Sequence, residues 1–287
     1  MTELLPALPP LTKVIQRHGL SARKELGQHF LLDPGITRRI AAAAGSLEGR
    51  DVIEIGPGPG GLTRALLESP CRRVIVVEKD SRCLEALAEL AQAYPGRLEV
   101  VADDALKLEV WHLGTAPRKL VANLPYNVAT PLLIGWLQAL DRDHACLESL
   151  TLMFQKEVGQ RLVATPGTSA YGRLSIVTQW LTRAERCFDL PPGAFKPPPR
   201  IVSSVLRLTP HACPSPPARL VSLERVAGAA FGQRRKMLRQ SLKRLRVDTK
   251  QLLAAAGIEE TLRAETLTLA DFCRLAQALD RFTEGLA

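Results

Sequence analysis

The sequence predicts an α/β protein with a doubly wound parallel sheet, followed by a small all-α domain. Short runs of Val, Ile and Leu alternate with helical segments over the first two hundred residues. Prolines then cluster at positions 210, 214, 216 and 217, and beyond them the pattern is helical only. Because buried parallel strands read as continuous apolar runs, we expect the sheet in residues 1–209, with an N-terminal extension at 1–25, and the all-α domain in residues 210–287.

The first helix is marked by its two ends. Asp33 is suited to cap the N-terminus, Pro34 to occupy the first helical position and Gly45 to end the helix. After this helix, strands are expected at residues 50–56, 72–80, 97–105, 119–126 and 149–154. Helices are expected between them at residues 61–69, 82–94, 129–140 and 155–164. Residues 185–192 and 203–209 complete the sheet as two added strands, predicted to form a hairpin at one edge.

The C-terminal residues carry an excess of positive charge. The chain has a formal net charge of +9, and residues 231–250 hold eight basic residues against one acid. A helix is expected at 222–231, a break at Gly232, a basic helix at 234–245, and two shorter helices after it. Clustered positive charge is typical of a polyanion partner, whereas a merely solvated helix face would intersperse both signs. The candidate contacts to RNA phosphates are Arg234, Arg235, Lys236, Arg239, Lys243 and Arg246.

Several protein classes are disfavoured. No apolar run approaches the ~20 residues of a membrane span, and the first residues lack the pattern of a secretory signal. The six cysteines form no C-x-x-C pair and the five histidines no H-x-x-x-H, so we expect reduced thiols and no metal site. A cytoplasmic protein, monomeric and without a membrane partner, is the expectation.

A glycine-rich loop joins the first buried strand to a helix. In "IEIGPGPGGLT", Gly56, Gly58 and Gly61 satisfy G-x-G-x-x-G, and Glu78 ends the next strand about twenty residues on. A carboxylate at that position suits the two ribose hydroxyls of NAD or of S-adenosylmethionine. A tight turn without any ligand remains an alternative.

The prolines of this loop favour S-adenosylmethionine over NAD. A pyrophosphate is held by backbone N–H groups, and Pro57 and Pro59 remove two of them. S-adenosylmethionine has a sulfonium cation instead of a phosphate, and a nearby carboxylate such as Glu54 suits that cation. Asp104, at the end of the third strand, is a candidate acceptor for the adenine amino group, although ordinary turn chemistry also explains an Asp-Asp pair.

Asn123, Leu124, Pro125 and Tyr126 lie where the strand expected at 119–126 ends, and they suggest a site for an aromatic amine. The Asn123 side-chain oxygen and the Leu124 carbonyl would accept the two N–H hydrogens, and Pro125 would aim that carbonyl. The Tyr126 ring would stack on the target ring and stabilise the positive charge that develops on the attacked nitrogen. Phe195, before the prolines at 197–199, is the candidate second stacking face. The alternatives are a structural Asn-Pro loop and a Phe that fills a core edge.

Taken together, these motifs resemble the ribosomal RNA adenine N6-dimethyltransferase family. The resemblance runs through seven blocks in the family's order, which are "LGQHFLLD", "IEIGPGPGGLT", "VVEKD", "ADDAL", "ANLPYN", "FKPPPRIVSS" and "FGQRRKMLRQSL". The branch that acts on small-subunit (16S) RNA is the most similar. The resemblance implies a Rossmann-like methyltransferase sheet, S-adenosylmethionine as the cofactor, and dimethylation of two adjacent adenines near the 3′ end of 16S rRNA in the small-subunit precursor during 30S assembly.

The resemblance also implies roles for individual residues. The cofactor contacts are His29, Leu31, Gly56, Glu78, Asp104 and Asn123, to which Glu54 and Gly58 are added from the loop chemistry. The target amine is held by Asn123, Leu124, Pro125 and Tyr126, with Phe195 on the other side. Position 29 departs from the usual Asn, so a backbone contact would survive there while a specific side-chain role is in doubt.

Four alternatives remain at this point. An NAD-dependent oxidoreductase would be indifferent to RNA. A non-catalytic RNA-binding assembly factor would share the fold but has no need of Asn-Leu-Pro-Tyr. A methyltransferase of large-subunit RNA would share nearly all the motifs. DNA or protein-glutamine methylation fits the basic C-terminal residues less well.

Overall fold

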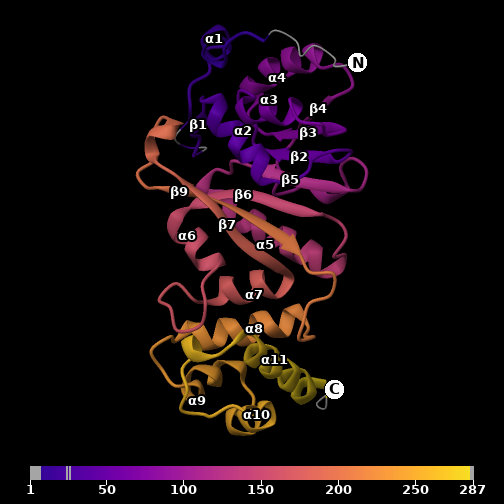
Figure 1. Ribbon diagram of the computed structural model, residues 1–287. Coiled ribbons are helices and arrows are strands. Elements are labelled where there is room, and N and C mark those ends of the chain that lie inside the picture. The colour runs from indigo at the N-terminus through magenta and orange to yellow at the C-terminus, as the bar shows by residue number, and fades with distance from the viewer. Residues whose placement is uncertain (1–7, 24, 26, 285–287) are drawn as a thin grey trace. The chain divides into compact units, whose positions relative to one another are not determined.

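The computed structural model describes residues 8–23, 25 and 27–284 (Figure 1). Its contacts divide the chain into two compact units. The first comprises Met1–Gly159 and Glu185–Pro210, and the second comprises Gln160–Ala184 and His211–Ala287. One change of unit, after Pro210, falls at the expected domain boundary, but residues 160–184 group with the C-terminal residues. The assignment of one domain to catalysis and the other to RNA stays a prediction.

The first unit is built on a seven-stranded sheet in the order β4-β3-β2-β5-β6-β9-β7. The strands are β2 (Asp51–Ile55), β3 (Arg73–Glu78), β4 (Leu98–Ala102), β5 (Arg118–Ala122), β6 (Ser149–Gln155), β7 (Thr182–Leu190) and β9 (Ser203–Pro210). The first five strands in that spatial order pair in parallel, and β9 pairs antiparallel with β6. The doubly wound sheet and the two added strands at one edge are therefore confirmed. A separate two-stranded ribbon pairs β1 (Phe30–Leu31) with β8 (Phe195–Lys196).

The strand order reverses between β2 and β5. From β2 the chain proceeds outward to β3 and β4, and then returns to the other side of β2 as β5. At such a switch point the loops leaving the two central strands diverge and leave a crevice beyond their carboxyl ends. The glycine loop follows β2 and Asn123 follows β5, so both lie at this edge of the sheet.

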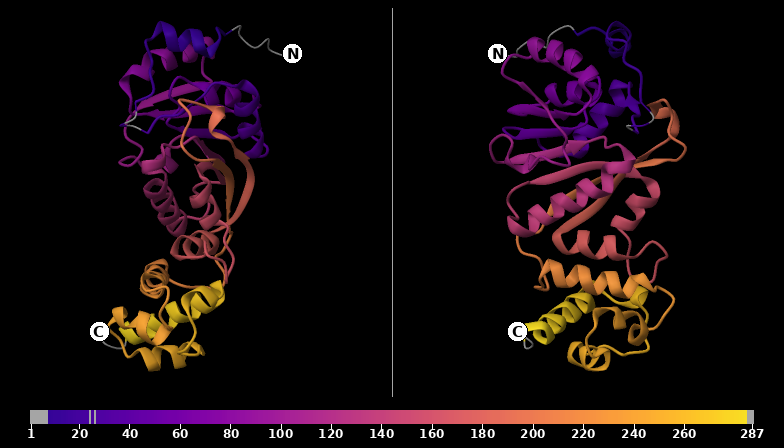
Figure 2. Two further views of the ribbon diagram at one scale, coloured as in Figure 1. Left: turned by 90° about the vertical axis from the view of Figure 1, so that its left-hand side faces the viewer. Right: turned by 180° about the vertical axis from the view of Figure 1, so that it is seen from behind.

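Helices cover both faces of the sheet. The helices of this part of the chain are α1 (Leu11–Arg17), α2 (Pro34–Ala43), α3 (Gly61–Leu67), α4 (Ser81–Ala93), α5 (Tyr126–Arg142) and α6 (Lys156–Leu162). Apolar residues of α2, α3 and α4 pack in one cluster with Val52, Val74, Val76 and Val121 of the strands. Helix α5 lies behind the sheet in Figure 1 and in front of it in the reverse view of Figure 2.

Helix α2 begins and ends as its sequence predicts. The Asp33 carboxylate accepts a hydrogen bond from the Gly35 N–H at 2.7 Å, and Pro34 occupies the first helical position. Gly45 follows the helix with a φ of +73°, a conformation that disfavours a side chain. Helix α1 and the later helix α7 (Arg173–Leu181) are additions to the expected elements.

The second unit is helical. Its remaining helices are α8 (Leu220–Gly232), α9 (Leu238–Ser241), α10 (Thr249–Ala256) and α11 (Leu269–Glu284). Phe231 stacks on Phe272 with ring centroids 5.5 Å apart and meets Tyr171 edge-on at 5.8 Å. The Tyr171 hydroxyl donates to the Leu267 carbonyl at 3.0 Å, so segments far apart in the sequence share one core.

Two expectations for the C-terminal residues are wrong. The basic segment is not a continuous helix over 234–245. It consists of a turn, the four-residue helix α9 and a 3₁₀ turn at Leu242–Leu245, and Arg246 after it has a φ of +58°. Leu238, Leu242 and Leu245 are nevertheless buried, as a shared apolar stripe requires. The last helix is also not short, since α11 has 16 residues.

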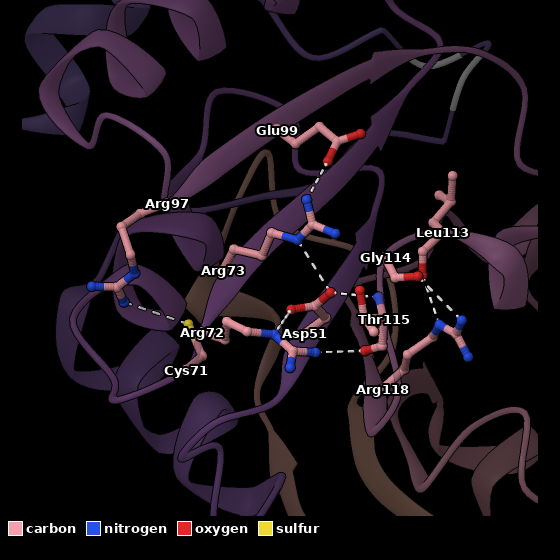
Figure 3. A network of polar contacts seen from close by, with 10 residues as sticks. All are labelled: Asp51, Cys71, Arg72, Arg73, Arg97, Glu99, Leu113, Gly114, Thr115 and Arg118. Carbon is pink, nitrogen blue, oxygen red and sulfur yellow. Dashed lines mark hydrogen bonds and ion pairs between the residues drawn. The ribbon is translucent and has the colours of Figure 1, made fainter.

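An ion-pair network holds the amino ends of the central strands (Figure 3). The carboxylate of Asp51, fully buried at the start of β2, accepts hydrogen bonds from Arg72 Nε at 2.6 Å, Arg73 Nε at 3.1 Å and the Thr115 N–H at 2.6 Å. Burial by itself would raise the pKa of Asp51, but these three donors hold it below its ordinary value. The network joins β2, β3 and the loop before β5 at the end of the sheet away from the crevice.

Candidate functional site

The crevice at the switch point contains a cavity of about 310 Å³. Its walls come from the segment before β1, the loops after β2, β3, β4 and β5, and the start of α5. The structure brings eleven predicted site residues to this cavity, which are His29, Leu31, Glu54, Gly56, Gly58, Glu78, Asp104, Asn123, Leu124, Pro125 and Tyr126. A cavity of this size, lined by apolar groups and a few polar ones, is typical of a small-molecule site.

The glycine loop after β2 is not arranged to hold a phosphate. The N–H groups of Gly56 and Gly60 donate to the carbonyls of Val77 and Pro57, at 2.9 and 3.0 Å. The Gly58 N–H donates to the Glu78 carboxylate at 2.9 Å. Since the prolines between these glycines have no N–H, the loop's own donors are used within the protein. The geometry therefore supports a cofactor without a pyrophosphate.

Backbone conformation explains one of these glycines, and close packing explains another. Gly58 has a φ of +55°, which a residue with a side chain rarely adopts. A Cβ at Gly61, the first residue of α3, would lie 2.5 Å from the Leu31 carbonyl oxygen. The absence of a side chain at Gly61 lets the segment around β1 pack directly on the loop and close one wall of the cavity.

Glu78 is positioned as an acceptor for a diol. One carboxylate oxygen accepts the Gly58 N–H, and the other accepts the Asp80 N–H at 2.7 Å. Each oxygen keeps a second lone pair for a ribose hydroxyl. Burial raises the pKa of Glu78, and the two backbone donors counteract that rise. Sequence reasoning predicted the ribose role but not the coupling of this carboxylate to the glycine loop.

Glu54 is a buried acid that lacks a full set of partners. It is 1% exposed, and among the described residues its Oε2 atom has no hydrogen-bond partner. Burial, followed by the negative charge of Glu78, raises the pKa of Glu54 to about 8. A buried carboxyl of this kind is stabilised by a cationic ligand in the cavity. The sulfonium and ammonium groups of S-adenosylmethionine supply such a charge, so the residues present fit this cofactor.

Asp104 and Leu106 form the wall beyond β4. The Asp104 carboxylate pairs with Lys79 Nζ at 2.7 Å and accepts the Leu106 N–H at 3.1 Å. Lys79 is the main cause of a lowered pKa of Asp104, so this acceptor is ionised. Leu106 is half exposed, which is unusual for a large apolar side chain, and offers a surface for a flat ring. Sequence reasoning missed Leu106, because the ADDAL block drew attention to its carboxylates.

The orientation of the Asn123 side chain is set by a main-chain carbonyl. Asn123 Nδ2 donates to the His29 carbonyl oxygen at 3.0 Å. Because a carbonyl can only accept, the amide nitrogen must face His29, which leaves the Asn123 oxygen available as an acceptor. Gln28, also missed from the sequence, holds the same segment by donating to Asp80 at 2.9 Å.

The remaining residues of the motif form the start of α5. Pro125 precedes the helix with a φ of −58°, and Tyr126 is its first residue. The Tyr126 hydroxyl lies 2.5 Å from Ser203 Oγ of β9, which fixes the position of the outer end of the ring. Burial raises the pKa of Tyr126. The aromatic ring is therefore held rigidly at the wall of the cavity, beside the Asn123 amide.

Phe195 does not have the exposed face that the sequence suggested. It is 5% exposed and packs in the core cluster with Leu190 and Val205. Its backbone pairs with Leu31 in the β1–β8 ribbon, so the ring lies behind the cavity wall. The structure does bring Phe195 near the site, but as a buried ring.

Comparisons with known proteins identify the family. The ribosomal RNA adenine dimethylase family matches residues 19–281. This chain belongs to that family. It is 58% identical to the ribosomal RNA small subunit methyltransferase A of Xanthobacter autotrophicus over 98% of this chain and 97% of the relative. It is also 58% identical to the protein of the same name from Rhodospirillum rubrum, over 95% of this chain and 93% of the relative.

Two solved structures of related enzymes share the fold. A dimethyladenosine transferase from Plasmodium falciparum superposes with a TM-score of 0.77 at 26% identity, covering 89% of this chain and 98% of that one. The 23S rRNA methyltransferase ErmE superposes with a TM-score of 0.66 at 27% identity, covering 88% and 99%. The expected Rossmann-like methyltransferase fold, the enzyme class of an rRNA adenine dimethyltransferase and the S-adenosylmethionine cofactor are confirmed. The oxidoreductase alternative is excluded.

The predicted RNA-binding residues of this family member lie in the second unit, and Arg234 differs from the others in its contacts within the fold. Arg234 donates to the carbonyls of Tyr171 at 2.8 Å and Thr168 at 2.9 Å, and it pairs with Glu265 at 3.1 Å. These contacts support the fold, and the role of Arg234 as an RNA contact stays a prediction. Arg239 is exposed and pairs with Glu260 at 3.4 Å. The other exposed basic side chains of residues 231–250 are Arg235, Lys236, Lys243, Arg244, Arg246 and Lys250.

Within the described part of the chain, no group of three or more His, Cys, Asp or Glu side chains is arranged to hold a metal ion. None of the helices there combines the length and the apolar sequence needed to cross a membrane.

Proposed function

We propose that this chain transfers methyl groups from S-adenosylmethionine to N6 of adenines in small-subunit (16S) rRNA. The products would be two adjacent dimethylated adenines near the 3′ end, formed during 30S assembly. The observation that carries the proposal is the Asn123 amide, whose oxygen is left free beside the cofactor cavity by the bond from its nitrogen to the His29 carbonyl. The names of the two relatives described above support the choice of small-subunit RNA.

The chemistry requires a poor nucleophile to attack. The lone pair of an adenine amino group is delocalised into the ring, and two acceptors at its N–H hydrogens favour the pyramidal, attacking form. The Asn123 oxygen accepts one hydrogen, and the Leu124 carbonyl, directed by the fixed φ of Pro125, accepts the other. Bound S-adenosylmethionine supplies a methyl group activated by a positively charged sulfur. Holding the two reactants in line supplies much of the rate acceleration.

The aromatic wall stabilises the charge that develops. Positive charge builds up on the attacked nitrogen, and the face of the Tyr126 ring is attractive to a cation. The bond from the Tyr126 hydroxyl to Ser203 keeps that ring in place without a rearrangement during the reaction. The target adenine has to leave its stack to reach the cavity, as base-modifying enzymes require.

The same acceptors serve a second methyl transfer. Once the nitrogen has taken the methyl group from sulfur, it loses one of its two protons to solvent, and the Asn123 oxygen accepts the N–H that remains. This arrangement supports dimethylation of each base, which is the reaction in the family's description.

The exposed basic residues of the second unit are proposed to bind rRNA phosphates. Arg235, Lys236, Arg239, Lys243 and Arg246 are all exposed, and they lie within twelve residues of one another in the sequence. Phosphate contacts of this kind supply sequence-independent affinity that weakens as salt is added. The cytoplasmic location and the monomeric state stay predictions.

The direct test is methylation of under-methylated small ribosomal subunits with labelled S-adenosylmethionine, followed by mass-spectrometric mapping of the modified nucleotides. We expect label on two adjacent adenines, and we expect Asn123→Ala to reduce the rate at least a hundredfold, because one acceptor aimed at the transition state is lost. An unchanged methyl count in Asn123→Ala would show that the target pocket is assigned wrongly.

A second candidate is methylation of large-subunit RNA. The structural similarity to a 23S rRNA methyltransferase is the observation that favours it. Parallel reactions with protein-free 23S rRNA and with small subunits separate the two candidates. Label on 23S rRNA alone would replace the proposed substrate, and binding to small subunits without label on either RNA would indicate a non-catalytic assembly factor.

A further inference from the structure

The target-base pocket of the proposed function needs two aromatic surfaces. Tyr126 lines the cavity and supplies one of them. Phe195, at 5% exposed, is too deeply buried to supply the other in this structure. The aromatic ring that lies beside Tyr126 instead is that of His29, a residue for which the resemblance suggested only a cofactor contact.

The His29 ring is placed between the two expected surfaces. Its centroid lies 5.6 Å from that of Tyr126, and the two planes are inclined by 34°. Its centroid lies 6.4 Å from that of Phe195, with the planes near perpendicular at 76°. His29 and Tyr126 line the same cavity, and Phe195 meets the imidazole in an edge-to-face contact behind it.

Two polar contacts hold His29 in this position. Its Nδ1 atom lies 2.8 Å from the Pro197 carbonyl oxygen, and because a carbonyl only accepts, Nδ1 carries the hydrogen. The His29 main-chain carbonyl accepts the Asn123 amide at 3.0 Å. The neighbouring β1–β8 pairing, Phe30 with Lys196 and Leu31 with Phe195, joins the same two segments through the backbone. The imidazole is therefore anchored to the proline-rich segment and adjacent to the proposed methyl acceptor.

We infer that the imidazole of His29 is the second aromatic surface for the target adenine, with the Phe195 ring as its support. This inference rests on the proposed function and deepens it. A purine inserted between two rings needs centroids about 7 Å apart, since each layer takes up about 3.5 Å. The present 5.6 Å separation of His29 and Tyr126 is short of that by roughly 1.4 Å, so the inference requires the two rings to move apart by that distance when the base enters.

The test measures adenosine binding to the full chain saturated with S-adenosylhomocysteine, so that the cofactor cavity is already occupied. The variants are His29→Ala, which removes the ring but keeps the main-chain carbonyl, and His29→Phe, which keeps a ring. The matched control is His112→Asn, at an exposed histidine that also has an aromatic neighbour, Trp111 at 6.1 Å. Cofactor affinity, measured separately by calorimetry, reports whether each variant keeps a folded cavity.

We expect His29→Ala to weaken adenosine binding about five- to tenfold, the low end of the effect of removing one stacking surface. His29→Phe is expected to stay within about twofold of the parent protein, and His112→Asn to match it. In the parent protein the ring-carbon proton signals of His29, identified by their loss in His29→Ala, should shift upfield when adenosine stacks. Cofactor affinity should change by less than about twofold in all three variants.

Unchanged adenosine affinity in His29→Ala would overturn the inference. Tighter binding in that variant would also overturn it, since the ring would then block the base instead of stacking on it. Asn123→Ala in the same assay separates this failure from a failure of the proposed function. Weaker binding in Asn123→Ala with no effect of His29→Ala refutes the role of His29 alone, whereas no effect of either variant refutes the target pocket itself.

Discussion

Replacing Glu54 by Gln is expected to make the protein more stable and a weaker cofactor binder. The Glu54 side chain is buried, with an oxygen that lacks a partner among the described residues, and its pKa is raised to about 8 from an ordinary value of 4.5. An acid whose pKa is higher in the folded protein lowers stability as pH rises from the unfolded value to the folded one. The destabilisation is absent near pH 4, grows above pH 4.5 and is complete above pH 8.

The size of the effect follows from the shift. Between pH 4.5 and pH 7, Glu54 is ionised in the unfolded chain but mostly neutral in the folded protein. This interval of about 2.5 pH units costs roughly 3 kcal/mol of stability, at 1.36 kcal/mol per unit. Gln is neutral at every pH, so Glu54→Gln recovers this energy at pH 7. About 2 °C per kcal/mol is usual for a chain of this size, so the melting temperature should rise by about 6 °C at pH 7 and by almost nothing at pH 4.5.

Cofactor binding should respond in the opposite direction. A carboxylate that neutralises a bound cation contributes about 1.5–3 kcal/mol, so Glu54→Gln should raise the dissociation constant for S-adenosylmethionine roughly ten- to a hundredfold. Because the ionised form of Glu54 is the one that attracts the cation, affinity in the parent protein should increase between pH 6 and pH 8. In Glu54→Gln that pH dependence should disappear.

Thermal unfolding and calorimetric titration across pH 4.5–8.5 test both effects. Glu78→Gln is the matched control, since both oxygens of Glu78 accept backbone N–H groups and an amide NH₂ would face one of those donors. That variant should lose about 1–3 kcal/mol of stability at pH 7. A Glu54→Gln protein that is no more stable than the parent at pH 7, or whose stability difference does not grow with pH, would refute the reasoning.

Two further predictions concern the ion-pair network and the basic residues. Asp51→Asn should lower stability by about 1–2 kcal/mol near pH 7, because the buried carboxylate loses its ion pairs with two partly exposed arginines. The exposed Glu68→Gln should cost under about 1 kcal/mol. Since the pKa of Asp51 is lowered in the folded protein, its contribution to stability is present above pH 4 and fades as pH falls further. Equal melting curves for Asp51→Asn and Glu68→Gln would contradict the role of the buried carboxylate. Replacing Arg235 and Arg239 by Glu should weaken small-subunit binding at least tenfold and flatten its salt dependence, with cofactor affinity unchanged. The control Arg281→Glu in α11 should weaken small-subunit binding less. Equal losses in RNA and cofactor binding would rule out this division of labour.

Local features of the chain predicted much of the sheet and the cofactor loop. The run from Asp51 to Ile55 is apolar apart from two acids, and its buried environment follows from that composition. The alternation of strands and helices implied a sheet whose carboxyl ends meet at one edge, so Gly56 and Asn123 were expected to lie together. Such predictions succeed because strand and turn preferences depend on residues a few positions apart.

The errors concern segments whose conformation depends on distant partners. Residues 234–245 have a helical apolar spacing, but Met237 forms an isolated antiparallel bridge with Arg263, and Arg234 bonds to carbonyls more than sixty residues away. These long-range bonds override the local helical preference. The same contacts give Arg234, a candidate RNA ligand, hydrogen bonds within the fold that its sequence neighbours do not indicate.

The sequence by itself determined the order of strands and helices, the proline-bearing glycine loop and the acceptor-bearing turn after β5. These features depend on the conformational preferences of residues that are close together in the chain. Tertiary structure decided which atoms remain available to a ligand. The Gly58 N–H is used by Glu78, and the Asn123 side chain is oriented by a carbonyl 94 residues away. The His29 ring contacts the Pro197 carbonyl, 168 residues away, and packs edge-to-face against Phe195. Burial and hydrogen-bond partners of this kind exist only once distant segments have packed together, so no local pattern can encode them.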